Sequence, residues 1–433
     1  MSSNVSWKRQ MLKAAGITLI DCDHRTPPAA DEGYPYIAIP QLKSGHISLD
    51  GVRRISRDDY LEWTKKLKPQ AHDVIVVRRC NSGDSALVPA GLECAIGQNL
   101  VILRSNGKTV QPQFLRWLIN GPDWWEQVSK FINVGAVFDS LRCRDIPNFE
   151  LTIPPIKNQE NIAIILDALD NRITLLRETN ATLEAIAQAL FKSWFVDFDP
   201  VRAKMEGRPP EGMDEATAAL FPDGFEESEL GLVPRGWRIR PLDEIATYLN
   251  GLALQKFPPL DDSWLPVIKI AQLRKGDTVG ADRAGRNIKP EYIIQNGDVL
   301  FSWSGSLEVE VWCGGEGALN QHLFKVTSDT YPKWFYYLWT KHHLEHFRQI
   351  AASKATTMGH IQRAHLHRAK VIAPPDAFVS AVGEYFAPLL DRWVSTALQA
   401  QTLATLRDTL LPRLISGQLR LPEIESRIRE SVL

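Results

Sequence analysis

The chain is poor in cysteine and lacks the spacings that would make its cysteines structural. Its 433 residues include five cysteines, an odd number with no C-x-x-C pair, which argues against a disulfide framework and against a zinc ribbon. No stretch of about 18 apolar residues occurs, and the first ten residues, MSSNVSWKRQ, contain no apolar run. The sequence therefore predicts a protein of the reducing cytoplasm that is neither exported nor membrane-spanning.

Common catalytic motifs are also missing. Asn106-Gly107-Lys108-Thr109 resembles the end of a P-loop, but Ile102 stands where the loop requires its first glycine. No G-x-G-x-x-G follows a strand-like run, and the serines of residues 302–306 lack the glycine that precedes the serine in G-x-S-x-G. The sequence gives no support for a nucleotide-binding or serine-hydrolase site.

Histidines provide the one metal hypothesis. His342 and His346 are four residues apart, so on a single helix they would share one face as zinc ligands can. No H-E-x-x-H pattern and no neighbouring Cys or Asp completes a ligand set, so a helix face turned toward phosphates or solvent is favoured and no metal is predicted. A metal-dependent hydrolase that uses His342 and His346 remains the alternative to the non-catalytic functions considered below.

The net charge of −1 conceals regions of opposite sign. Residues 43–79 carry a net +4 and residues 333–370 a net +6 with six histidines besides, whereas residues 196–236 carry a net −6. Basic regions of this kind neutralise phosphates and steer association with nucleic acids. For either region alone, ordinary solvated surface charge is the alternative.

A repeat at an offset of 220 residues runs through the chain. Pro154-Pro155 opens one helical stretch that ends near Trp194, and Pro374-Pro375 opens another that ends near Leu414. Solenoid repeats have periods of about 20 to 50 residues, so this one is a duplicated domain with its helix. We expect two similar globular domains and a target with two related halves, because one ordinary domain has only about 100 to 200 residues.

Both helical stretches carry an apolar seam of coiled-coil spacing. A helix over about 158–195 would be roughly 55 to 60 Å long at 1.5 Å per residue, so each helix is expected to pack along the other, with packing on its own domain as the alternative. Asn180 stands where an a position is due, a device that fixes register; Thr396 and Arg407 interrupt the second seam, and Pro388 is predicted to start or kink that helix. The predicted spacer residues are Leu166, Leu169, Ile173, Leu176, Asn180, Leu183, Leu190, Trp194, Phe386, Leu389, Trp393, Leu403, Leu410 and Leu414.

The segments ahead of the helices repeat more loosely. Asp73-Val74 matches Asp298-Val299 and Gln98 matches Gln321, while the offset drifts from 231 to 220. Short apolar runs alternate with helical patterns, so the predicted fold is α/β or α+β: two similar domains joined by two long antiparallel coiled-coil-like helices, with a pseudo-twofold internal repeat. The copies share framework positions and differ in loops, where binding specificity usually resides.

Polar side chains that could read DNA gather at similar places in the two copies. Arginine pairs well with guanine, and Asn or Gln pairs well with adenine; a phosphate contact or an ordinary surface position is the alternative for each. The candidates are Lys43, Ser44, Arg53, Arg54, Arg57, Arg78, Arg79, Asn81, Ser82, Arg274, Lys275, Arg283, Arg286, Asn287, Lys289, Ser302, Ser304, Lys354, Thr356, Thr357, His360 and Gln362.

Taken together, these features resemble the specificity subunit of type I restriction-modification systems. The resemblance covers essentially the whole chain and rests on FVDFDPVRAKMEGRPPEGM after the first helix, on LLPRLISGQLRL at the end of the second, and on the frame motifs GYPYIAIPQL and ATTMGHIQRAHL. The second copy departs from the family pattern at its helix start. It has Asp376-Ala377-Phe378 where the first copy has Ile156-Lys157-Asn158-Gln159-Glu160. A helix-mediated structural or regulatory protein is the other non-catalytic reading.

The resemblance implies a DNA-reading subunit without catalysis of its own. Two target recognition domains, expected over 1–155 and 237–375, would each read one half of a split site in the major groove of double-stranded DNA. Spacer helices over 156–196 and 376–418, joined by an acidic connector over 197–236 and followed by a tail over 419–433, would hold the half-sites apart and dock two methyltransferase subunits, which modify adenine after flipping it. Restriction subunits would complete the complex in a bacterial or archaeal cytoplasm, and S-adenosylmethionine, ATP and magnesium would all belong to partners.

Overall fold

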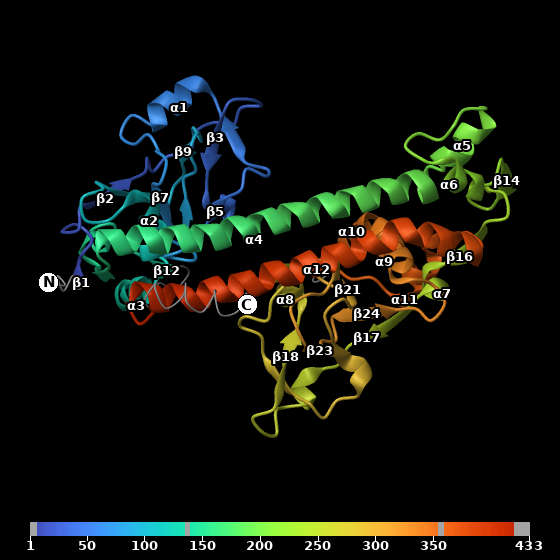
Figure 1. Ribbon diagram of the computed structural model, residues 1–433. Helices are drawn as coiled ribbons and strands as arrows, with labels where there is room; N and C mark the ends of the chain where they lie inside the picture. Colours follow the sequence, from blue (N-terminus) through green and yellow to red (C-terminus); the bar gives the residue numbers. More distant parts are fainter. Residues whose placement is uncertain (1–6, 135–138, 354–358, 420–433) are drawn as a thin grey trace, which may run out of the picture. The chain divides into compact units, whose positions relative to one another are not determined.

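The computed structural model describes residues 7–134, 139–353 and 359–419. The chain divides into two compact units. Unit 1 consists of the residues up to Arg172 and those from Leu403 onward, and unit 2 consists of Ile173–Thr402. The long helices α4 (Ile156–Phe191) and α12 (Asp376–Ile415) each contribute one part to each unit (Figure 1).

Unit 1 is built around a four-stranded antiparallel sheet. Its strand order is β2 (Ile17–Asp21), β10 (Leu100–Ser105), β7 (Val74–Val77) and β8 (Ser85–Leu87). The VIVV run of β7 is buried along its whole length because both faces of the sheet are covered. Val74 and Val76 belong to the core shared with the long helices, whereas Ile75 and Val77 belong to a second core on the other face. This alternation follows from the two-residue period of a strand.

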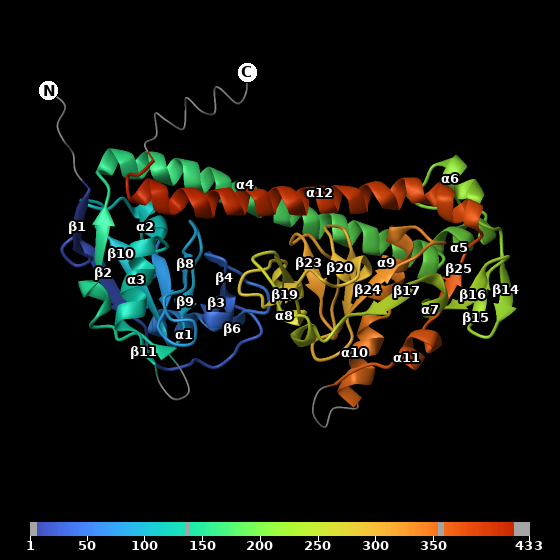
Figure 2. The same ribbon diagram turned by 90° about the horizontal axis from the view of Figure 1, so that it is seen from below.

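The remaining elements of unit 1 cover that sheet. A smaller sheet has the order β6 (Arg53–Ile55), β3 (Tyr34–Ile37), β9 (Ala95–Ile96), in which β3 and β9 are parallel. Helix α2 (Pro112–Leu118) lies between the strands and the long helices (Figure 2). The other elements are β1 (Lys8–Met11), which pairs with β13 (Glu150–Ile153), β4 (Leu42–Lys43), β5 (His46–Ile47), β11 (Asn133–Val134), β12 (Asp139–Ser140), α1 (Arg57–Trp63) and α3 (Pro122–Phe131).

Unit 2 repeats the topology of unit 1, with one additional strand in its second sheet. Its four-stranded antiparallel sheet has the order β17 (Thr247–Asn250), β24 (Leu323–Thr327), β21 (Val299–Ser302), β22 (Val309–Val311). The second sheet has the order β19 (Arg283–Gly285), β18 (Trp264–Ile268), β23 (Gly317–Leu319), β20 (Ile293–Ile294), and β18 and β23 are parallel, as β3 and β9 are. The other elements are β16 (Arg238–Pro241), which pairs with β25 (Lys370–Ala373), α7 (Leu242–Ile245), α8 (Ile270–Lys275), α9 (Lys333–His342), α10 (Leu344–Ser353) and α11 (Arg363–Arg368).

The acidic segment expected to be a connector is folded onto unit 2. It contains α5 (Asp199–Met205), α6 (Glu215–Leu220) and a hairpin of β14 (Phe225–Ser228) with β15 (Gly231–Pro234). Phe198, Val201 and Phe221 from this segment are buried in the main core of unit 2. The connector therefore consists of short helices and a hairpin that pack on the rest of unit 2.

Polar residues that interrupt the apolar seams of the two long helices form hydrogen bonds with each other. In unit 2, the Asn180 amide donates to the Trp393 carbonyl oxygen at 3.1 Å, and the Thr396 hydroxyl donates to the Asn180 side-chain oxygen. In unit 1, Arg407 donates to Asp170 at 2.5 Å. The residues that interrupt one seam thus bind polar residues of the other helix, and within each unit the two helices run antiparallel. All of the predicted spacer residues are buried or half-buried.

Helix α12 does not start at Pro388, and this part of the prediction is wrong. The helix is continuous from Asp376 through Pro388. Pro388 is exposed, and inside the helix it removes the single backbone donor that the Glu384 carbonyl would otherwise have. The helix ends at Ile415, before Gly417, whose φ of 75° is the left-handed conformation common just after a helix.

The two helix starts differ chemically, which explains the departure noted in the sequence. Gln159 is fully buried; its side-chain nitrogen donates to the Pro154 carbonyl at 2.7 Å, and its side-chain oxygen accepts from the Gln111 backbone at 2.8 Å. Val379 occupies the corresponding position of the second copy and is buried among apolar residues. Unit 1 therefore fixes its helix start by hydrogen bonds and unit 2 by packing.

Candidate nucleic-acid interface

The segment after β7 forms a polar edge in unit 1, called edge 1 and defined by Arg78, Arg79, Asn99 and Ser140. The Arg78 backbone donates to the Asn99 carbonyl at 2.8 Å, and the Arg78 carbonyl accepts from Leu141 at 2.9 Å. Arg79 and Ser140 form a further β-bridge. These contacts join three chain segments, so the backbone that carries the Arg79 side chain is held in place.

Left-handed backbone conformations shape edge 1. Cys80, Asn81 and Asn99 have φ angles of 57°, 72° and 67°. Non-glycine residues rarely adopt such angles. Where they do, the residue often belongs to a functional site. The resulting tight turn leaves Arg79 and Asn81 exposed to solvent.

Unit 2 has an equivalent edge, called edge 2 and defined by Trp303, Ser304, His322 and His360. The Trp303 backbone donates to the His322 carbonyl at 3.3 Å, and the Trp303 carbonyl accepts from Ile361 at 2.9 Å, while Ser304 and His360 form the matching β-bridge. These contacts correspond one for one to those of edge 1. The two edges are therefore the same structural position carrying different side chains.

The side chains of the two edges differ in charge and in bonding. In edge 1, the largely buried Arg78 guanidinium lies 3.9 Å from the Asp21 carboxylate. In edge 2, the Trp303 indole donates to Asn250 at 2.9 Å, and the Ser304 hydroxyl lies 2.9 Å from His322 Nδ1. Edge 1 also carries the exposed Arg79, whose guanidinium can bind guanine or a phosphate, whereas edge 2 carries imidazole, indole and amide groups. A shared scaffold with different polar groups suits recognition of two different short sequences.

Several of these residues were missed at the sequence level. Asp21, Asn99, Asn250, Trp303 and His322 were not among the predicted candidates. A signal was available for two of them, because Asn99 and His322 directly follow the matched glutamines at 98 and 321. Asn250 and Asp21 become comparable only through the strand register that places each beside its edge.

The hydroxyl groups of three predicted serines have hydrogen-bond partners within the protein. Ser82 is buried and its hydroxyl donates to the Arg78 carbonyl at 2.9 Å. Ser302 is fully buried; its hydroxyl donates to the Ser306 carbonyl at 2.6 Å and accepts from the Glu308 backbone at 2.8 Å. Ser304 is buried against His322. The Ser82 and Ser302 hydroxyls each close a turn and are buried, so for these two the structure argues against the predicted role, whereas the Ser304 hydroxyl lies beside His322 within edge 2.

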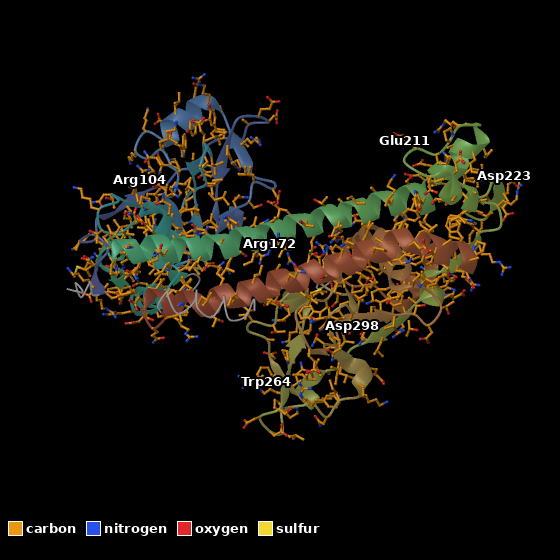
Figure 3. All side chains as sticks on the ribbon, viewed as in Figure 1. Arg104, Arg172, Glu211, Asp223, Trp264 and Asp298 are labelled. Atoms are coloured by element: carbon orange, nitrogen blue, oxygen red, sulfur yellow. The ribbon has the colours of Figure 1, made fainter. Side chains whose placement is uncertain are left out.

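The arginines of the smaller sheets form a separate group. Arg53 and Arg54 on β6 donate to the carbonyls of Pro27 and Gly33, each at 2.8 Å. In unit 2 the Arg283 guanidinium lies 4.4 Å from the centre of the Trp264 ring, which is labelled in Figure 3. Arg286 pairs with Glu316 at 2.5 Å and Lys289 with Glu291 at 4.0 Å. Each of these side chains therefore has a partner within its own unit.

The other predicted candidates have simple placements. Lys43 and Ser44 lie at the turn between β4 and β5, and Ser44 has a φ of 50°. Lys354, Thr356 and Thr357 lie outside the described residues. The exposed remainder comprises Arg57, Arg274, Lys275, Asn287, His360 and Gln362.

The histidine metal hypothesis fails on geometry. Helix α9 ends at His342 and α10 begins at Leu344, so His342 and His346 do not share one helix face. Burial lowers the pKa of His342, and burial lowers the pKa of His343 to about 4, while the ring of His343 bonds the Lys370 carbonyl at 2.9 Å. Among the residues that the structure describes, no group of metal-binding side chains includes these histidines. The hydrolase alternative is therefore rejected.

Each unit joins its globular part to the long helices through a charge cluster, which is centred on a buried carboxylate in unit 1 and is half-buried in unit 2. In unit 1, Asp170 on α4 accepts from Arg116 on α2 at 2.5 Å, lies 2.5 Å from Arg407 on α12 and contacts His46 on β5 at 2.8 Å. In unit 2, Lys341 on α9 pairs with Glu184 on α4 and lies 3.5 Å from Glu310. Both clusters fix the angle at which an edge-bearing domain sits on its own helices.

In the described part of the chain, no helix is both long and apolar enough to cross a membrane.

Comparison with known proteins matches both copies of the repeat. Residues 23–185 and 234–377 each match the family model of the type I restriction modification DNA specificity domain. The HindI specificity subunit of Haemophilus influenzae is 25% identical over 373 residues, which cover 75% of this chain and 81% of that protein. The MjaIX specificity subunit of Methanocaldococcus jannaschii is 22% identical over 383 residues, which cover 86% and 83% of the two chains.

A solved structure supports the fold. The type I restriction-modification S subunit from M. genitalium matches with a TM-score of 0.53 at 14% identity and covers 96% of this chain and 97% of its own. The family model covers well over half of the chain, with one copy in each half of the repeat. The chain therefore belongs to the type I restriction-modification DNA specificity family, and it is a DNA specificity subunit that carries no catalysis of its own.

Proposed function

We propose that unit 1 and unit 2 each read one half of a bipartite DNA sequence, with edge 1 and edge 2 as the base-contacting positions. The observation that carries this proposal is the one-for-one match of the backbone contacts around Arg78 and Trp303, combined with the different side chains at those positions. Hydrogen bonds to base edges in the major groove supply sequence specificity. Two unlike edges on one scaffold therefore read two unlike half-sites.

A domain exchange tests this division. The chain is co-expressed with its methyltransferase partner, residues 1–155 are replaced by the corresponding segment of another family member, and methylated adenines are mapped across the genome. We expect one half of the methylated motif to change completely while the other half and the gap stay the same, because edge 2 and the long helices are untouched. The reciprocal exchange of residues 237–375 should change the opposite half. A motif altered in both halves, or in neither, would show that the units do not read separately.

The long helices are proposed to dock two methyltransferase subunits, one on each unit. Ile186 on α4 and Leu406 on α12 are related by the 220-residue repeat, and they are 43% and 44% exposed. An exposed large apolar side chain repeated at equivalent places suits a partner that binds twice. Restriction subunits would join the same complex, and S-adenosylmethionine, ATP and magnesium would be bound by these partners.

Introducing a charge at either position tests the docking surface. Ile186→Asp and Leu406→Asp should each lower the number of bound methyltransferases from two to one per chain, and the double variant should bind none, because a carboxylate would be buried against an apolar partner. Size-exclusion chromatography with light scattering gives the stoichiometry. Gln188→Asp and Asp408→Asn change repeat-related exposed positions on another face and should leave two partners bound. If the double variant still bound two methyltransferases per chain, the docking surface could not include these two side chains.

A further inference from the structure

Edge 2 holds His322 by its backbone and by one ring nitrogen. The His322 backbone N–H donates to the Asn320 side-chain oxygen at 3.2 Å, and the His322 carbonyl accepts from the Trp303 backbone at 3.3 Å. The ring nitrogen Nδ1 lies 2.9 Å from the Ser304 hydroxyl oxygen. The other ring nitrogen, Nε2, has no partner among the described residues, and His322 is half-buried. The ring is therefore fixed in position while Nε2 stays available to a ligand.

Both sheets of unit 2 support this histidine. Asn320 is buried, and its backbone donates to the Ile268 carbonyl at the end of β18 at 3.3 Å. Trp303 directly follows β21, and its indole donates to the Asn250 side-chain oxygen at 2.9 Å. The centre of the Trp303 ring lies 5.8 Å from that of the His322 ring. Contacts to strands of both sheets therefore set the position of His322.

The Ser304 hydroxyl decides which ring nitrogen carries the proton. Ser304 is 4% exposed, and among the described residues His322 Nδ1 is the partner of its hydroxyl. If an Nδ1–H group donated to the hydroxyl oxygen, the hydroxyl proton would be left buried without an acceptor, which costs free energy. If the hydroxyl donates to Nδ1 instead, its proton has a partner, and the neutral imidazole carries its own proton on Nε2. The second arrangement satisfies the buried group.

We propose that His322 reads a base of the half-site of unit 2 by donating a hydrogen bond from Nε2–H, and that Ser304 is the positioning residue that sets this tautomer. The partner on the DNA is an acceptor atom on the major-groove side of a base, since an N–H group can only donate. This inference rests on the proposed function, because it takes edge 2 as a base-contacting position.

Edge 1 has no equivalent pair. Arg79 occupies the position of Ser304, because each forms the β-bridge of its own edge. Asn99 occupies the position of His322, because the carbonyl of each accepts from the residue that follows β7 or β21. Substitutions of Ser304 and His322 should therefore affect the half-site of unit 2 alone. The half-site of unit 1 serves as an internal control in the same molecule.

DNA binding by the full chain with its methyltransferase partner tests the inference. The duplexes carry each single base-pair change of the methylated motif, and affinities are measured by fluorescence anisotropy at one salt concentration. His322→Ala should lower the discrimination at one base pair of the half-site of unit 2 by about 10-fold and leave the other base pairs unchanged. Ser304→Ala should cause a smaller loss at the same base pair, because the ring then has no fixed tautomer.

Two conservative variants separate a donor at Nε2 from a merely structural ring. The amide N–H of glutamine can take the place of Nε2–H, whereas the shorter asparagine cannot reach it, so His322→Gln should keep more discrimination than His322→Asn. Ser380→Ala removes an exposed hydroxyl from α12 in the same unit and should change no base preference.

A modified base identifies the acceptor. An analogue of the selected base that lacks its major-groove acceptor, such as a deazapurine, should weaken binding of the wild type by about 10-fold. It should weaken binding of His322→Ala much less, because both changes remove the same hydrogen bond.

Three results would overturn the inference: intact base preferences in His322→Ala, equal weakening of the wild type and His322→Ala by every such analogue, or an effect of Ser304→Ala at other base pairs only. His322 is half-buried, so His322→Ala gives a test even if Ser304→Ala does not fold. A change in the half-site of unit 1 caused by His322→Ala would contradict the proposed function itself.

Discussion

Replacing Asp170 by alanine should destabilise unit 1 by about 3 to 5 kcal/mol, the cost of removing one partner from a buried ion pair. The Asp170 side chain is 2% exposed and is the common partner of Arg116, Arg407 and His46. Without it, two largely buried guanidinium groups face each other with no carboxylate between them. The loss should appear as earlier unfolding of unit 1 peptides in hydrogen exchange along a denaturant series.

Two further variants separate this effect from a general weakening of the helix. Glu160→Ala removes an exposed carboxylate from the same helix within unit 1 and should change stability by less than about 0.5 kcal/mol. Adding Arg407→Leu to Asp170→Ala should recover part of the loss, since it removes one of the uncompensated charges. Equal destabilisation by Glu160→Ala, or none by Asp170→Ala, would mean that the cluster does not hold the domain.

The same cluster predicts a pH dependence. Burial by itself would raise the pKa of Asp170, but His46, Arg116 and Arg407 hold it well below the ordinary range. A carboxyl whose folded pKa lies below its unfolded value of about 3.9 adds stability above that value. This contribution is lost as the pH falls below about 4. The stability difference between the wild type and Asp170→Asn should therefore shrink as the pH falls from about 4 toward 3.

Phe195→Ala should destabilise unit 2 by about 3 to 5 kcal/mol, the range for truncating a buried phenylalanine. Phe195 is fully buried in the π-helical turn Lys192–Val196 that continues α4. Its ring lies between 5.7 and 6.2 Å from the rings of Trp237, Trp334, Phe335, Phe378 and Phe386. These residues come from β16, α9 and α12 and their flanking segments, so the cavity would open where the connector, the globular domain and the helices meet.

Local hydrogen exchange provides the measurement for this variant as well. Peptides of the connector, residues 197–236, should lose protection together with those of α9, because Phe198 and Phe221 share the same core. Leu260→Ala, at a position 78% exposed in the same unit, should change stability by less than about 0.5 kcal/mol. Loss of protection confined to the connector would indicate that it folds independently of the rest of unit 2.

The repeat and the helices were predictable because their signals are local and periodic. The apolar seam repeats along a single helix, and Pro154-Pro155 and Pro374-Pro375 mark both helix starts within the sequence itself. The effect of Pro388 was misjudged because a proline removes only one backbone hydrogen bond from a helix, and the surrounding packing, which the local sequence does not show, decides whether the helix continues. The family resemblance, carried by the same periodic segments and the connector motif, was confirmed.

The DNA-reading candidates were harder to predict because exposure is decided by contacts between distant segments. Ser82 and Ser302 are polar and adjacent to the edges, yet each is buried as the turn after its strand closes. Asn99 and His322 belong to the edges only because their carbonyls accept hydrogen bonds from the backbones of Arg78 and Trp303, at the ends of other strands. A prediction from residue type alone selected the two serines. It did not select Asn99 and His322, which the pairing of the strands places at the edges.

The sequence by itself determined that this protein contains a duplication and two long helices, because a repeat and an apolar periodicity can be read from the order of the residues alone. Its connector and helix-end motifs carried the resemblance to DNA specificity subunits. The tertiary structure decided which polar groups meet. Asn180 bonds Thr396, Asp170 binds Arg407, and Arg78 lies beside Asp21. The first two pairs join residues more than 200 positions apart, and hydrogen bonds and ion pairs act only over a few ångströms, so only the folded chain brings such partners together.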